Sequence, residues 1–347
     1  MKLTDQTILV TGGCGFIGSN FVRYIHQHYP DVTIVNLDKL TYAGNPENLR
    51  DIGDSQRYHF VKGDICDGEL VDELFGEHTP DILVNFAAES HVDRSIGDPD
   101  EFIETDIFGA YRLLEAARKH GIKRFIQIST DEVYGSIEDG KFREDDPLMP
   151  RNPYSASKAG ADRLAYSYSQ TYELPVIITR ASNNFGPYQY PEKLISLFVT
   201  NAIDDQELPL YGDGKNVRDW LYVEDHCDAI RFLIEHGEVS EVYNIGGGNE
   251  RQNIEITHLI LDLLGKDKSL IRPVKDRKGH DRRYALDTSR LEELGWTPEH
   301  AGKEGFRQAM RQTVEWYKEN DEWWRPLKSG EFLEYYKSHY NMELSEE

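Results

Sequence analysis

A tyrosine and a lysine four residues apart offer the first candidate chemistry in this chain. Tyr154 and Lys158 belong to the segment YSASK, directly after Asn152-Pro153, a pair that is typical of a helix start. Four-residue spacing puts both side chains on one face of that helix. A free tyrosine has a pKa of about 10 and is a poor base near neutrality, but a cation beside it favours the phenolate. Such a pair on its own is usually an ordinary surface pair, so the rest of the chain decides whether it is catalytic.

Two adjacent acids are the second feature. Asp131 and Glu132 lie in the segment STDEVYG, immediately after the apolar stretch Phe125–Ile128. If that stretch is a strand of an open α/β sheet, its carboxyl end faces the ligand crevice, and the two acids can meet a substrate there. Adjacent acids in an exposed loop are commonly solvated or cap a helix. The position after a strand favours contact with a substrate.

A glycine-rich turn near the start of the chain is the third feature. The segment TGGCGFIG follows an apolar stretch and opens a helical one. In this context Gly12 permits the tight turn, Gly15 lets a pyrophosphate approach the backbone, and Gly18 lets helix and strand pack together. The helix that begins at Phe16-Ile17 presents N–H groups to the phosphates. The pattern predicts a dinucleotide-binding site, which favours a catalytic role for the tyrosine and lysine pair.

An acid 20 residues beyond the last of these glycines indicates which dinucleotide binds. Asp38 ends the next apolar segment and can accept hydrogen bonds from ribose hydroxyls, whereas it would repel a 2′-phosphate. NAD is therefore favoured over NADP. Lys39 beside it leaves some use of NADP conceivable.

These groups need a sheet that brings distant strand ends together. Six apolar segments alternate with helical stretches: Thr7–Thr11, Thr33–Leu37, His59–Val61, Ile82–Phe86, Phe125–Ile128 and Val176–Thr179. Their near-continuous hydrophobicity fits strands covered on both faces, and the intervening lengths fit crossover helices. The sequence therefore predicts an α/β fold with a Rossmann-type doubly wound parallel sheet. After about Ser182 the alternation fades into loops, with helices expected at Glu255–Leu264 and Glu304–Asn320, and a substrate-specificity region would lie there.

Composition narrows the class of protein. The chain has 347 residues, of which 39% are hydrophobic, enough for a sizeable core. Its 62 acidic and 39 basic residues give a formal charge of −23, which opposes broad attraction to nucleic acid or anionic membranes. A phosphorylated ligand would need local cations and backbone amides in a cleft. The acid excess itself is best explained by solubility or salt adaptation.

Cysteine usage and hydropathy predict where the protein works. Cys14, Cys66 and Cys227 are widely spaced, with no CxxC or Cys/His cluster, so neither a disulfide framework nor a metal site is expected. No apolar run approaches the roughly 18 residues of a membrane span, and the first ten residues lack the features of a signal peptide. We therefore expect a cytoplasmic protein with reduced cysteines and no nucleic-acid or membrane partner.

Together the motifs resemble those of the extended short-chain dehydrogenase/reductases and, more narrowly, of the dTDP-glucose 4,6-dehydratases. The resemblance rests on the glycine turn, STDEVYG and YSASK, together with AAESHVDRS at 87–95, NNFGPY at 183–188, PEKL at 191–194, YGDG at 211–214, RDW at 218–220 and DRKGHDRRY at 276–284. It covers nearly the whole chain. The Asp131-Glu132 pair discriminates, because related epimerases carry small residues there, while related decarboxylases and other dehydratases typically keep the glutamate alone. Lys278, where the family often has proline, is a departure that we expect to matter little.

The resemblance implies conversion of dTDP-glucose to dTDP-4-keto-6-deoxyglucose and water, with NAD as a retained hydride carrier. Tyr154, assisted by Lys158, would remove the proton of the 4-hydroxyl as hydride leaves C4, while Thr130 hydrogen-bonds the oxygen. Glu132 would take the C5 proton and Asp131 would protonate the departing C6 hydroxyl, after which hydride returns to C6. An epimerase or decarboxylase of the same family and a non-catalytic NAD-binding regulator are the alternatives. The residues leave thymidine and uridine nucleotides both open.

The resemblance also implies binding residues. Arg218 and Arg277 would anchor the diphosphate, with help from Asn183 and Lys193. Further substrate contacts would be Ser90, Tyr211 at the nucleobase, Asn253 at the phosphates, and Tyr284. Further cofactor contacts would be Asp64 and Ile65 at adenine, and Ala87 and Ala88 at the phosphates or ribose.

A division of the chain and an oligomeric state follow from the same resemblance. Residues 1–182 with 219–245 would form the NAD-binding Rossmann domain, residues 183–218 with 246–330 a smaller, mainly C-terminal nucleotide-sugar-binding domain, and residues 331–347 a C-terminal tail. A homodimer is expected, with pairing through the helical stretches Glu101–His120 and Ser155–Tyr172.

Overall fold

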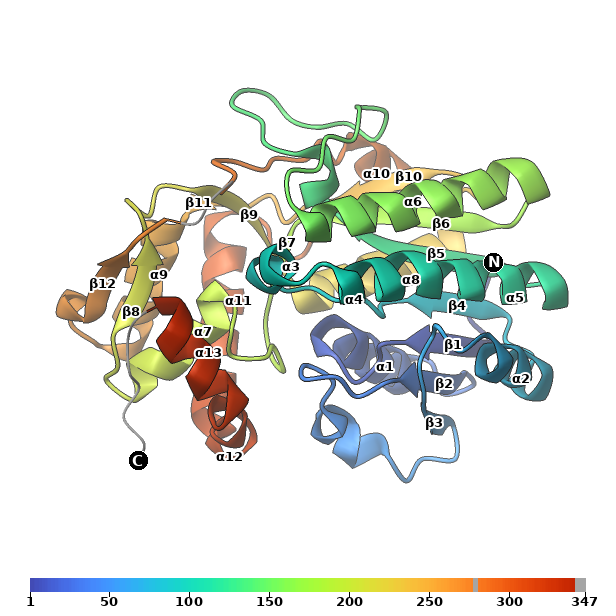
Figure 1. The fold of residues 1–347 in the computed structure, drawn as a ribbon, viewed down its shortest axis with the longest axis horizontal. Coiled ribbons are helices and arrows are strands. Elements are labelled where there is room, and N and C mark those ends of the chain that lie inside the picture. Colours follow the sequence, from blue (N-terminus) through green and yellow to red (C-terminus); the bar gives the residue numbers. More distant parts are fainter. Residues whose placement is uncertain (277–279, 341–347) are drawn as a thin grey trace.

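A parallel sheet of seven strands forms the centre of the structure, a computed structural model that describes residues 1–276 and 280–340 (Figure 1). The strands are β1 (Thr7–Thr11), β2 (Thr33–Asp38), β3 (Tyr58–Lys62), β4 (Ile82–Asn85), β5 (Arg124–Thr130), β6 (Val176–Ala181) and β10 (Val242–Ile245), in the spatial order β10-β6-β5-β4-β1-β2-β3. All neighbours pair in parallel. The predicted doubly wound sheet and its six strands are confirmed. The seventh, β10, was missed because its four residues include a buried asparagine, Asn244.

Both faces of the sheet are covered because side chains alternate between two cores along each strand. Ile8 and Val10 of β1 belong to one core, and Leu9 between them belongs to the other. The helices are α1 (Phe16–His28) and α8 (Val223–His236) on the first side, and α2 (Gly68–His78), α5 (Ala110–His120) and α6 (Pro153–Tyr172) on the second. This layering leaves the carboxyl ends of the strands open for a ligand.

A smaller group of elements packs beside the large sheet around its own core (Figure 1). Its strands form a sheet in the order β11-β9-β7 and a pair, β12-β8: β7 (Asn183–Phe185), β8 (Leu208–Tyr211), β9 (Val217–Tyr222), β11 (Glu250–Gln252) and β12 (Ile271–Val274). Its main helices are α7 (Leu194–Ile203), α9 (Asn253–Leu264) and α11 (Gly302–Glu319), which confirms the two helices expected after residue 250. The smaller, mainly C-terminal domain of the predicted fold is therefore present.

Segments cross between the two groups of elements. After β9 the chain returns to the large sheet, to which it adds α8 and β10, so residues 223–245 sit as expected in the Rossmann part. Residues 219–222 instead remain in β9 of the smaller part. A later helix, α10 (Ser289–Leu294), contacts β10 and buries Leu291 in the core of the large sheet. Neither part is a single continuous stretch of chain.

The segment expected to be a C-terminal tail contains a helix. α13 (Glu331–Tyr340) follows the short helix α12 (Asp321–Trp324) and packs Phe332 and Tyr336 into the core of the smaller part. The tail prediction was wrong for residues 331–340 because aromatic side chains four residues apart form one apolar stripe on a helix. Residues 341–347 lie outside the described residues.

The helix expected over Glu101–His120 is not uniform. α4 (Asp100–Phe102) leads into a π-helical segment, η2 (Ile103–Gly109), before α5 begins. π-Helical segments are rare and frequently lie at functional sites. Here the segment carries Asp106, which is buried. The remaining short elements are α3 (Val92–Gly97) and the 3-10 turns η1 (Pro46–Ile52), η3 (Asp131–Tyr134), η4 (Lys268–Leu270) and η5 (Pro326–Lys328).

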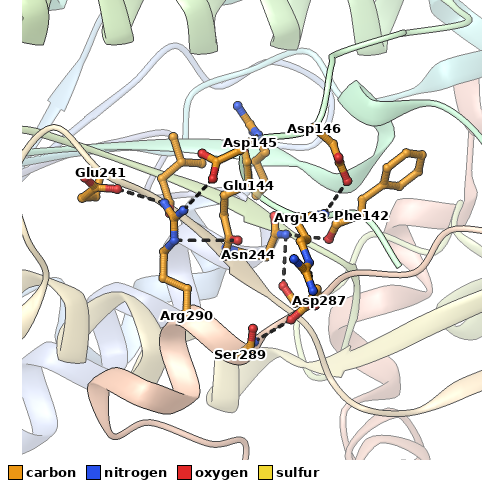
Figure 2. Close-up of polar contacts among 12 residues, drawn as sticks. Phe142, Arg143, Glu144, Asp145, Asp146, Glu241, Asn244, Asp287, Ser289 and Arg290 are labelled. Atoms are coloured by element: carbon orange, nitrogen blue, oxygen red, sulfur yellow. Dashed lines mark hydrogen bonds and ion pairs between the residues drawn. The ribbon is translucent and has the colours of Figure 1, made fainter. Parts of the chain in front are cut away.

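Polar contacts fix the loop that precedes α6 to the edge of the large sheet (Figure 2). Arg290 of α10 donates from Nη1 to Glu241 Oε2 at 2.9 Å and from Nη2 to Asp145 Oδ2 at 3.2 Å. The backbone N–H of Asn244 in β10 donates to Glu144 Oε1 at 3.0 Å. The loop is therefore anchored on the side of β10, next to the turn that carries the two adjacent acids.

Two further expectations can be compared with the structure. Cys14, Cys66 and Cys227 form no disulfide. Within residues 1–276 and 280–340, no helix is both long enough and apolar enough to cross a membrane.

Candidate active site

A cavity of about 430 Å³ lies between the strand ends of the large sheet and the smaller group of elements. Of the predicted site residues that the structure describes, all except Tyr284 line it: Gly12, Gly15, Phe16, Ile17, Gly18, Asp38, Lys39, Asp64, Ile65, Ala87, Ala88, Ser90, Thr130, Asp131, Glu132, Tyr154, Lys158, Asn183, Lys193, Tyr211, Arg218 and Asn253. Arg277 lies outside the described residues. The fold thus brings residues from the whole chain to one cavity.

The glycine turn is shaped by close backbone approach. Gly12 has φ of +69°, and a Cβ there would lie 2.7 Å from the backbone nitrogen of Ala87. A Cβ on Gly18 would clash with the carbonyl oxygen of Gly12. Gly15 occupies the N-cap position of α1, and within the described residues no side chain caps that helix. The first N–H groups of α1, which begins at Phe16, therefore open onto the cavity, as a phosphate site requires.

Asp38 joins the glycine turn to the loop after β2. Its carboxylate accepts from the backbone N–H of Cys14 at 2.8 Å and from that of Leu40 at 2.8 Å. Burial raises the pKa of Asp38, and these two hydrogen bonds oppose that change. Each carboxylate oxygen can accept further hydrogen bonds, so a ribose hydroxyl can still be bound here.

Lys39, the residue that kept NADP conceivable, has a partner of its own. Its Nζ lies 2.8 Å from Asp64 Oδ2, and the hydrogen bond that Lys39 donates to this carboxylate raises the pKa of Lys39. Both residues line the cavity. A 2′-phosphate would have to compete with Asp64 for this cation and would also face Asp38, which supports the preference for NAD.

The acid pair lies on the η3 turn at the end of β5. Thr130 Oγ1 donates to Asp131 Oδ1 at 3.1 Å and accepts from the backbone N–H of Glu132 at 3.3 Å. Asp131 is 2% exposed, and its Oδ2 has no hydrogen-bond partner in the described part of the chain. Burial, with the nearby charge of Glu132, raises the pKa of Asp131 well above its ordinary value. Asp131 is therefore suited to hold a proton and donate it.

Glu132 lies toward the start of α6. Asn152 caps that helix by accepting from the backbone N–H of Ser155 at 2.8 Å, and its Nδ2 lies 3.5 Å from Glu132 Oε2. The helix that carries Tyr154 and Lys158 is thus linked at its first turn to the acid turn. The expected helix start at Asn152-Pro153 is confirmed, with Asn152 as the N-cap.

Tyr154 and Lys158 lie where the cavity meets the large sheet, with Lys158 buried and Tyr154 half-buried. Burial raises the pKa of Tyr154 well above its ordinary value, and a hydrogen bond with Thr130 opposes that change. Burial lowers the pKa of Lys158, whereas the charges of Asp106 and Asp162 raise it. Two buried carboxylates thus help to keep the ammonium charged, and the ammonium in turn favours the phenolate.

Asp106 was missed by sequence reasoning. One of its carboxylate oxygens accepts from the backbone N–H of Glu89 at 3.0 Å, and the other accepts from Ser157 Oγ. It is 3% exposed, and burial raises its pKa to about 6. Asp106 lies in a stretch that the sequence predicts as an ordinary helix, so its neighbours in the chain do not indicate that its side chain is buried. The π-helical segment turns this side chain inward.

A second buried acid supports the acid turn from behind. Arg180, which is 1% exposed, donates from Nε to Asp162 Oδ2 at 2.8 Å and from Nη1 to the hydroxyl of Tyr134 at 2.7 Å. Tyr134 ends η3 and in turn donates to Asn244 Oδ1 at 2.8 Å. Strands β6 and β10 thus hold the turn in place. These residues are far apart in the sequence, so the network is apparent only when the strands are assembled in the sheet.

Arg218 of β9 is fixed in the opposite wall. Its Nη2 donates to the backbone oxygen of Asp281 at 2.9 Å, and its guanidinium lies 4.4 Å from the centre of the Tyr284 ring. Tyr284 is buried and donates to Asp281 Oδ2 at 2.6 Å. Tyr284, expected to contact the substrate, is not among the residues that line the cavity, and its side chain packs behind Arg218.

Two buried amides in the same wall have unused acceptors. Asn183 Oδ1, in β7, and Asn253 Oδ1, at the start of α9, find no hydrogen-bond partner among residues 1–276 and 280–340. Both residues line the cavity. Because buried polar atoms in folded proteins are nearly always paired, these atoms indicate that a ligand with hydroxyl or N–H donors binds here.

Lys193 and Ser90 join the two sides of the cavity. Lys193 precedes α7 and donates from Nζ to the backbone oxygen of Ser90 at 2.9 Å. Next to it, Glu192 Oε1 accepts from the hydroxyl of Tyr42 at 3.1 Å. The predicted substrate contacts at Lys193 and Ser90 remain predictions, since in this structure the two residues contact each other.

Comparisons with known proteins agree with this geometry. The sequence model of the GDP-mannose 4,6-dehydratase family matches residues 9–309. The low-salt glycan biosynthesis protein Agl12 of Haloferax volcanii is 53% identical over 91% of this chain and 99% of its own, and the dTDP-glucose 4,6-dehydratase of Streptomyces niveus is 51% identical over 93% and 96%. The solved dTDP-glucose 4,6-dehydratase DesIV of Streptomyces venezuelae, with NAD and dTDP bound, is 52% identical, covers 93% of this chain and 100% of its own, and superposes with a TM-score of 0.88.

Proposed function

The chain belongs to the GDP-mannose 4,6-dehydratase family, and we propose that it is an NAD-dependent dTDP-glucose 4,6-dehydratase. The product is dTDP-4-keto-6-deoxyglucose. The observation that carries this proposal is the Asp131-Glu132 pair, of which Asp131 is buried, in one cavity with Tyr154, Lys158 and the glycine turn. Epimerisation at C4 needs no group to protonate a departing hydroxyl, whereas dehydration does.

NAD fits the residues at the glycine end of the cavity. Gly12 and Gly18 leave no room for side chains, the open N–H groups of α1 suit the pyrophosphate, and Asp38 suits the ribose. Ala87 and Ala88 would lie at the phosphates or ribose, with Asp64 and Ile65 at adenine. When bound, NAD supplies a hydride acceptor for C4 and the donor that returns the hydride to C6.

In the first step Tyr154 takes the proton of the 4-hydroxyl. Lys158 stabilises the phenolate that this role requires, and Thr130 holds the oxygen that becomes a ketone. Asp106 is a positioning residue, because it contacts Ser157 and its charge opposes the loss of the proton from Lys158.

In the second step the two acids act in opposite directions. The C4 ketone makes the C5 proton acidic, and Glu132 accepts that proton. Asp131 stays protonated to higher pH than an exposed aspartate, so it can donate to the C6 hydroxyl as this leaves as water. Two adjacent carboxyls can hold these opposite roles when their environments differ. Glu132 has a hydrogen-bond partner in Asn152, whereas Asp131 is almost completely buried.

The wall opposite the acids would bind the diphosphate and nucleotide. Arg218 presents to the diphosphate a guanidinium already oriented by Tyr284, while the unused oxygens of Asn183 and Asn253 can accept from hydroxyl or N–H groups of the nucleotide sugar. Lys193 and Tyr211 complete the proposed contacts within the described residues, and Arg277 remains a proposed phosphate ligand.

Product mass and isotope transfer test the proposal. Incubation with dTDP-glucose should give a product lighter by one water, and deuterium placed at C4 should be recovered at C6 without release of stoichiometric NADH. An unchanged mass would indicate an epimerase instead, and loss of carbon dioxide from a uronic-acid substrate would indicate a decarboxylase. UDP-glucose, assayed in parallel, tests whether the site selects thymidine.

We also infer that the protein is a homodimer. Large apolar side chains are exposed on η2 and α6: Ile103 is 45% exposed, Phe108 57%, Tyr166 38% and Tyr172 51%. These two segments belong to the helical stretches expected to pair, and a second copy of the same face would cover the side chains. Light scattering should give twice the chain mass, and Phe108→Glu should shift the protein toward the monomer. A monomer mass for the unmodified protein would contradict the inference.

We place the protein in the cytoplasm on account of its unpaired cysteines and its proposed use of NAD and a nucleotide sugar. Cell fractionation with activity measurements tests this location.

A further inference from the structure

The cavity ends in an aromatic wall that the proposed chemistry does not use. At this end it is lined by Phe198 of α7, Pro209 and Tyr211 of β8, His280, and Tyr340, the last residue of α13. The ring centres of Tyr211 and His280 lie 5.8 Å apart, with an edge-on geometry at 76°. Flat aromatic surfaces of this kind suit a nucleobase better than a sugar or a phosphate.

Tyr340 reaches this wall from the C-terminal helix. Its ring centre lies 5.9 Å from that of Tyr211, at an interplanar angle of 45°. It also lies 4.9 Å from the ring of Tyr336, one helical turn earlier. Burial, and then the neighbouring Tyr211, raises the pKa of the Tyr340 phenol, so the side chain enters the cavity as a neutral aromatic group.

The rest of α13 holds Tyr340 at this place. Tyr336 is 1% exposed, and its hydroxyl accepts from Asn201 Nδ2 of α7 at 3.1 Å. Phe332 packs edge-on against Tyr190, with ring centres 6.2 Å apart. Phe332 and Tyr336 therefore anchor the helix in the core of the smaller part, and Tyr340, the next aromatic residue on the same face, lines the cavity.

The roles assigned to the other lining residues leave the aromatic wall as the candidate contact for the nucleobase. The glycine turn and the catalytic groups occupy the large-sheet side, and Arg218 and Asn253 offer diphosphate contacts from β9 and α9. β8 and α13 then provide the aromatic groups at the remaining end of the smaller part. The family match stops at residue 309, so α13 lies beyond it.

We propose that Tyr340 binds the nucleobase of the substrate together with Tyr211, which makes the C-terminal helix part of the nucleotide-binding site. The proposal rests on the proposed function for the identity of the nucleotide. Stacking on an aromatic side chain contributes mainly to affinity, because the base is not a reacting group.

Tyr340→Ala in the full chain tests the proposal, with dTDP and inorganic pyrophosphate as probes. Loss of one stacking side chain should weaken dTDP binding about tenfold and raise KM for dTDP-glucose by a similar factor. Tyr340→Phe keeps the ring and should stay within about twofold of the unmodified protein. Inhibition by pyrophosphate, which has no base, and the Kd of NAD should be the same in all variants.

Glu334→Ala is the matched control, since Glu334 is exposed on the same helix. It should leave dTDP affinity unchanged. The proposal is overturned if Tyr340→Ala binds dTDP as tightly as the unmodified protein. It is also overturned if Tyr340→Ala weakens pyrophosphate and NAD as much as dTDP, because that result would show a general loss of structure. Failure of the proposed function is distinguishable: the unmodified protein would bind dTDP but release no dehydrated product.

Discussion

The two walls of the cavity differ in the kind of group that each one buries. The wall from the large sheet holds the acids Glu89 and Asp131, with Asp106 buried behind it, and the pKa values of all three are raised, chiefly by burial. The wall from the smaller part holds Arg218 and buried amides with unused acceptors. Acid–base chemistry needs carboxyls whose pKa values have been moved, whereas an anionic nucleotide needs cations and neutral polar groups. A chain with a net charge of −23 can bind an anion where the cavity holds a local cation, and Arg218 is such a group.

The walls also differ in how their side chains are held. Thr130, Asn152 and the glycine turn act within a few residues of the groups that they position. Arg218 depends on Asp281 and Tyr284, more than 60 residues away along the chain. Substitutions in the wall from the large sheet should therefore stop catalysis or destabilise the fold. Substitutions in the wall from the smaller part should weaken substrate binding.

The largest effect is expected from removing the catalytic phenol. Tyr154→Phe keeps the ring but cannot take the proton of the 4-hydroxyl, so turnover should fall about 10³- to 10⁴-fold. Reduction of bound NAD in a single turnover should be lost to the same extent. Tyr166→Phe, at an exposed position of the same helix, should keep normal turnover. Normal cofactor reduction in Tyr154→Phe would contradict the assignment.

The buried ion pair behind the acid turn should dominate stability. Arg180→Ala leaves buried Asp162 with only the part-exposed Arg163 as its cation and removes the hydrogen bond to Tyr134, so the free energy of unfolding should fall by about 3 kcal/mol. Urea unfolding measures this change. Arg118→Ala, which breaks the exposed pair with Glu115, should cost less than about 1 kcal/mol. Equal losses in the two variants would show that burial is not the cause.

Asp131→Asn should separate the two chemical steps. The amide keeps the shape of the side chain but cannot donate a proton as an acid, so water loss should slow about 100-fold. Oxidation at C4 should still occur, and reduced cofactor should accumulate in a single turnover. If Asp131→Asn and Tyr154→Phe blocked cofactor reduction equally, the roles of the two residues would not be distinct.

Glu89 should make stability depend on pH. Burial, followed by the charges of Glu101 and Asp106, raises its pKa from 4.5 to about 7. The folded state therefore holds this proton more tightly than the unfolded state, and the resulting stabilisation is complete below about pH 4.5 and lost as pH rises toward 7. Relative to Glu89→Gln, the unmodified protein should lose about 2 kcal/mol over this range.

Unfolding of both proteins at pH 5 and pH 8 measures this difference. Glu315→Gln, at an exposed position of α11, is the control and should show no such dependence. A constant difference between Glu89→Gln and the unmodified protein across this range would contradict a raised pKa for Glu89.

The smallest effect is expected from a substitution in the wall that the smaller part provides. Arg218→Lys keeps the charge but loses the forked donors and the packing on Tyr284, so KM for dTDP-glucose should rise about tenfold. Turnover at saturation should change little. Arg311→Lys, at an exposed position of α11, should leave both constants unchanged. A fall in turnover with an unchanged KM would show that Arg218 takes part in the chemical step. It would contradict the distinction between a catalytic wall and a binding wall.

The sequence alone predicts the parts of this protein that depend on neighbours in the chain. The glycine turn, the cap at Asn152 and the four-residue spacing of Tyr154 and Lys158 are local patterns, and hydrophobic runs indicate strands covered on both faces. Six strands of the large sheet follow from them, whereas the substrate-binding residues that line the cavity were expected only from the family resemblance.

Tertiary structure decides the properties that depend on contact between distant segments. Burial raises the pKa of Asp131, and the π-helical segment places Asp106 near Lys158, although neither effect has a local sequence signal. Tyr284 lies behind Arg218 instead of in the cavity, and the expected tail brings Tyr340 to the aromatic wall. Spacing along a helix or strand fixes which face a side chain occupies. The surroundings of that side chain are fixed only when the whole chain has folded. Its charge state and its role depend on those surroundings.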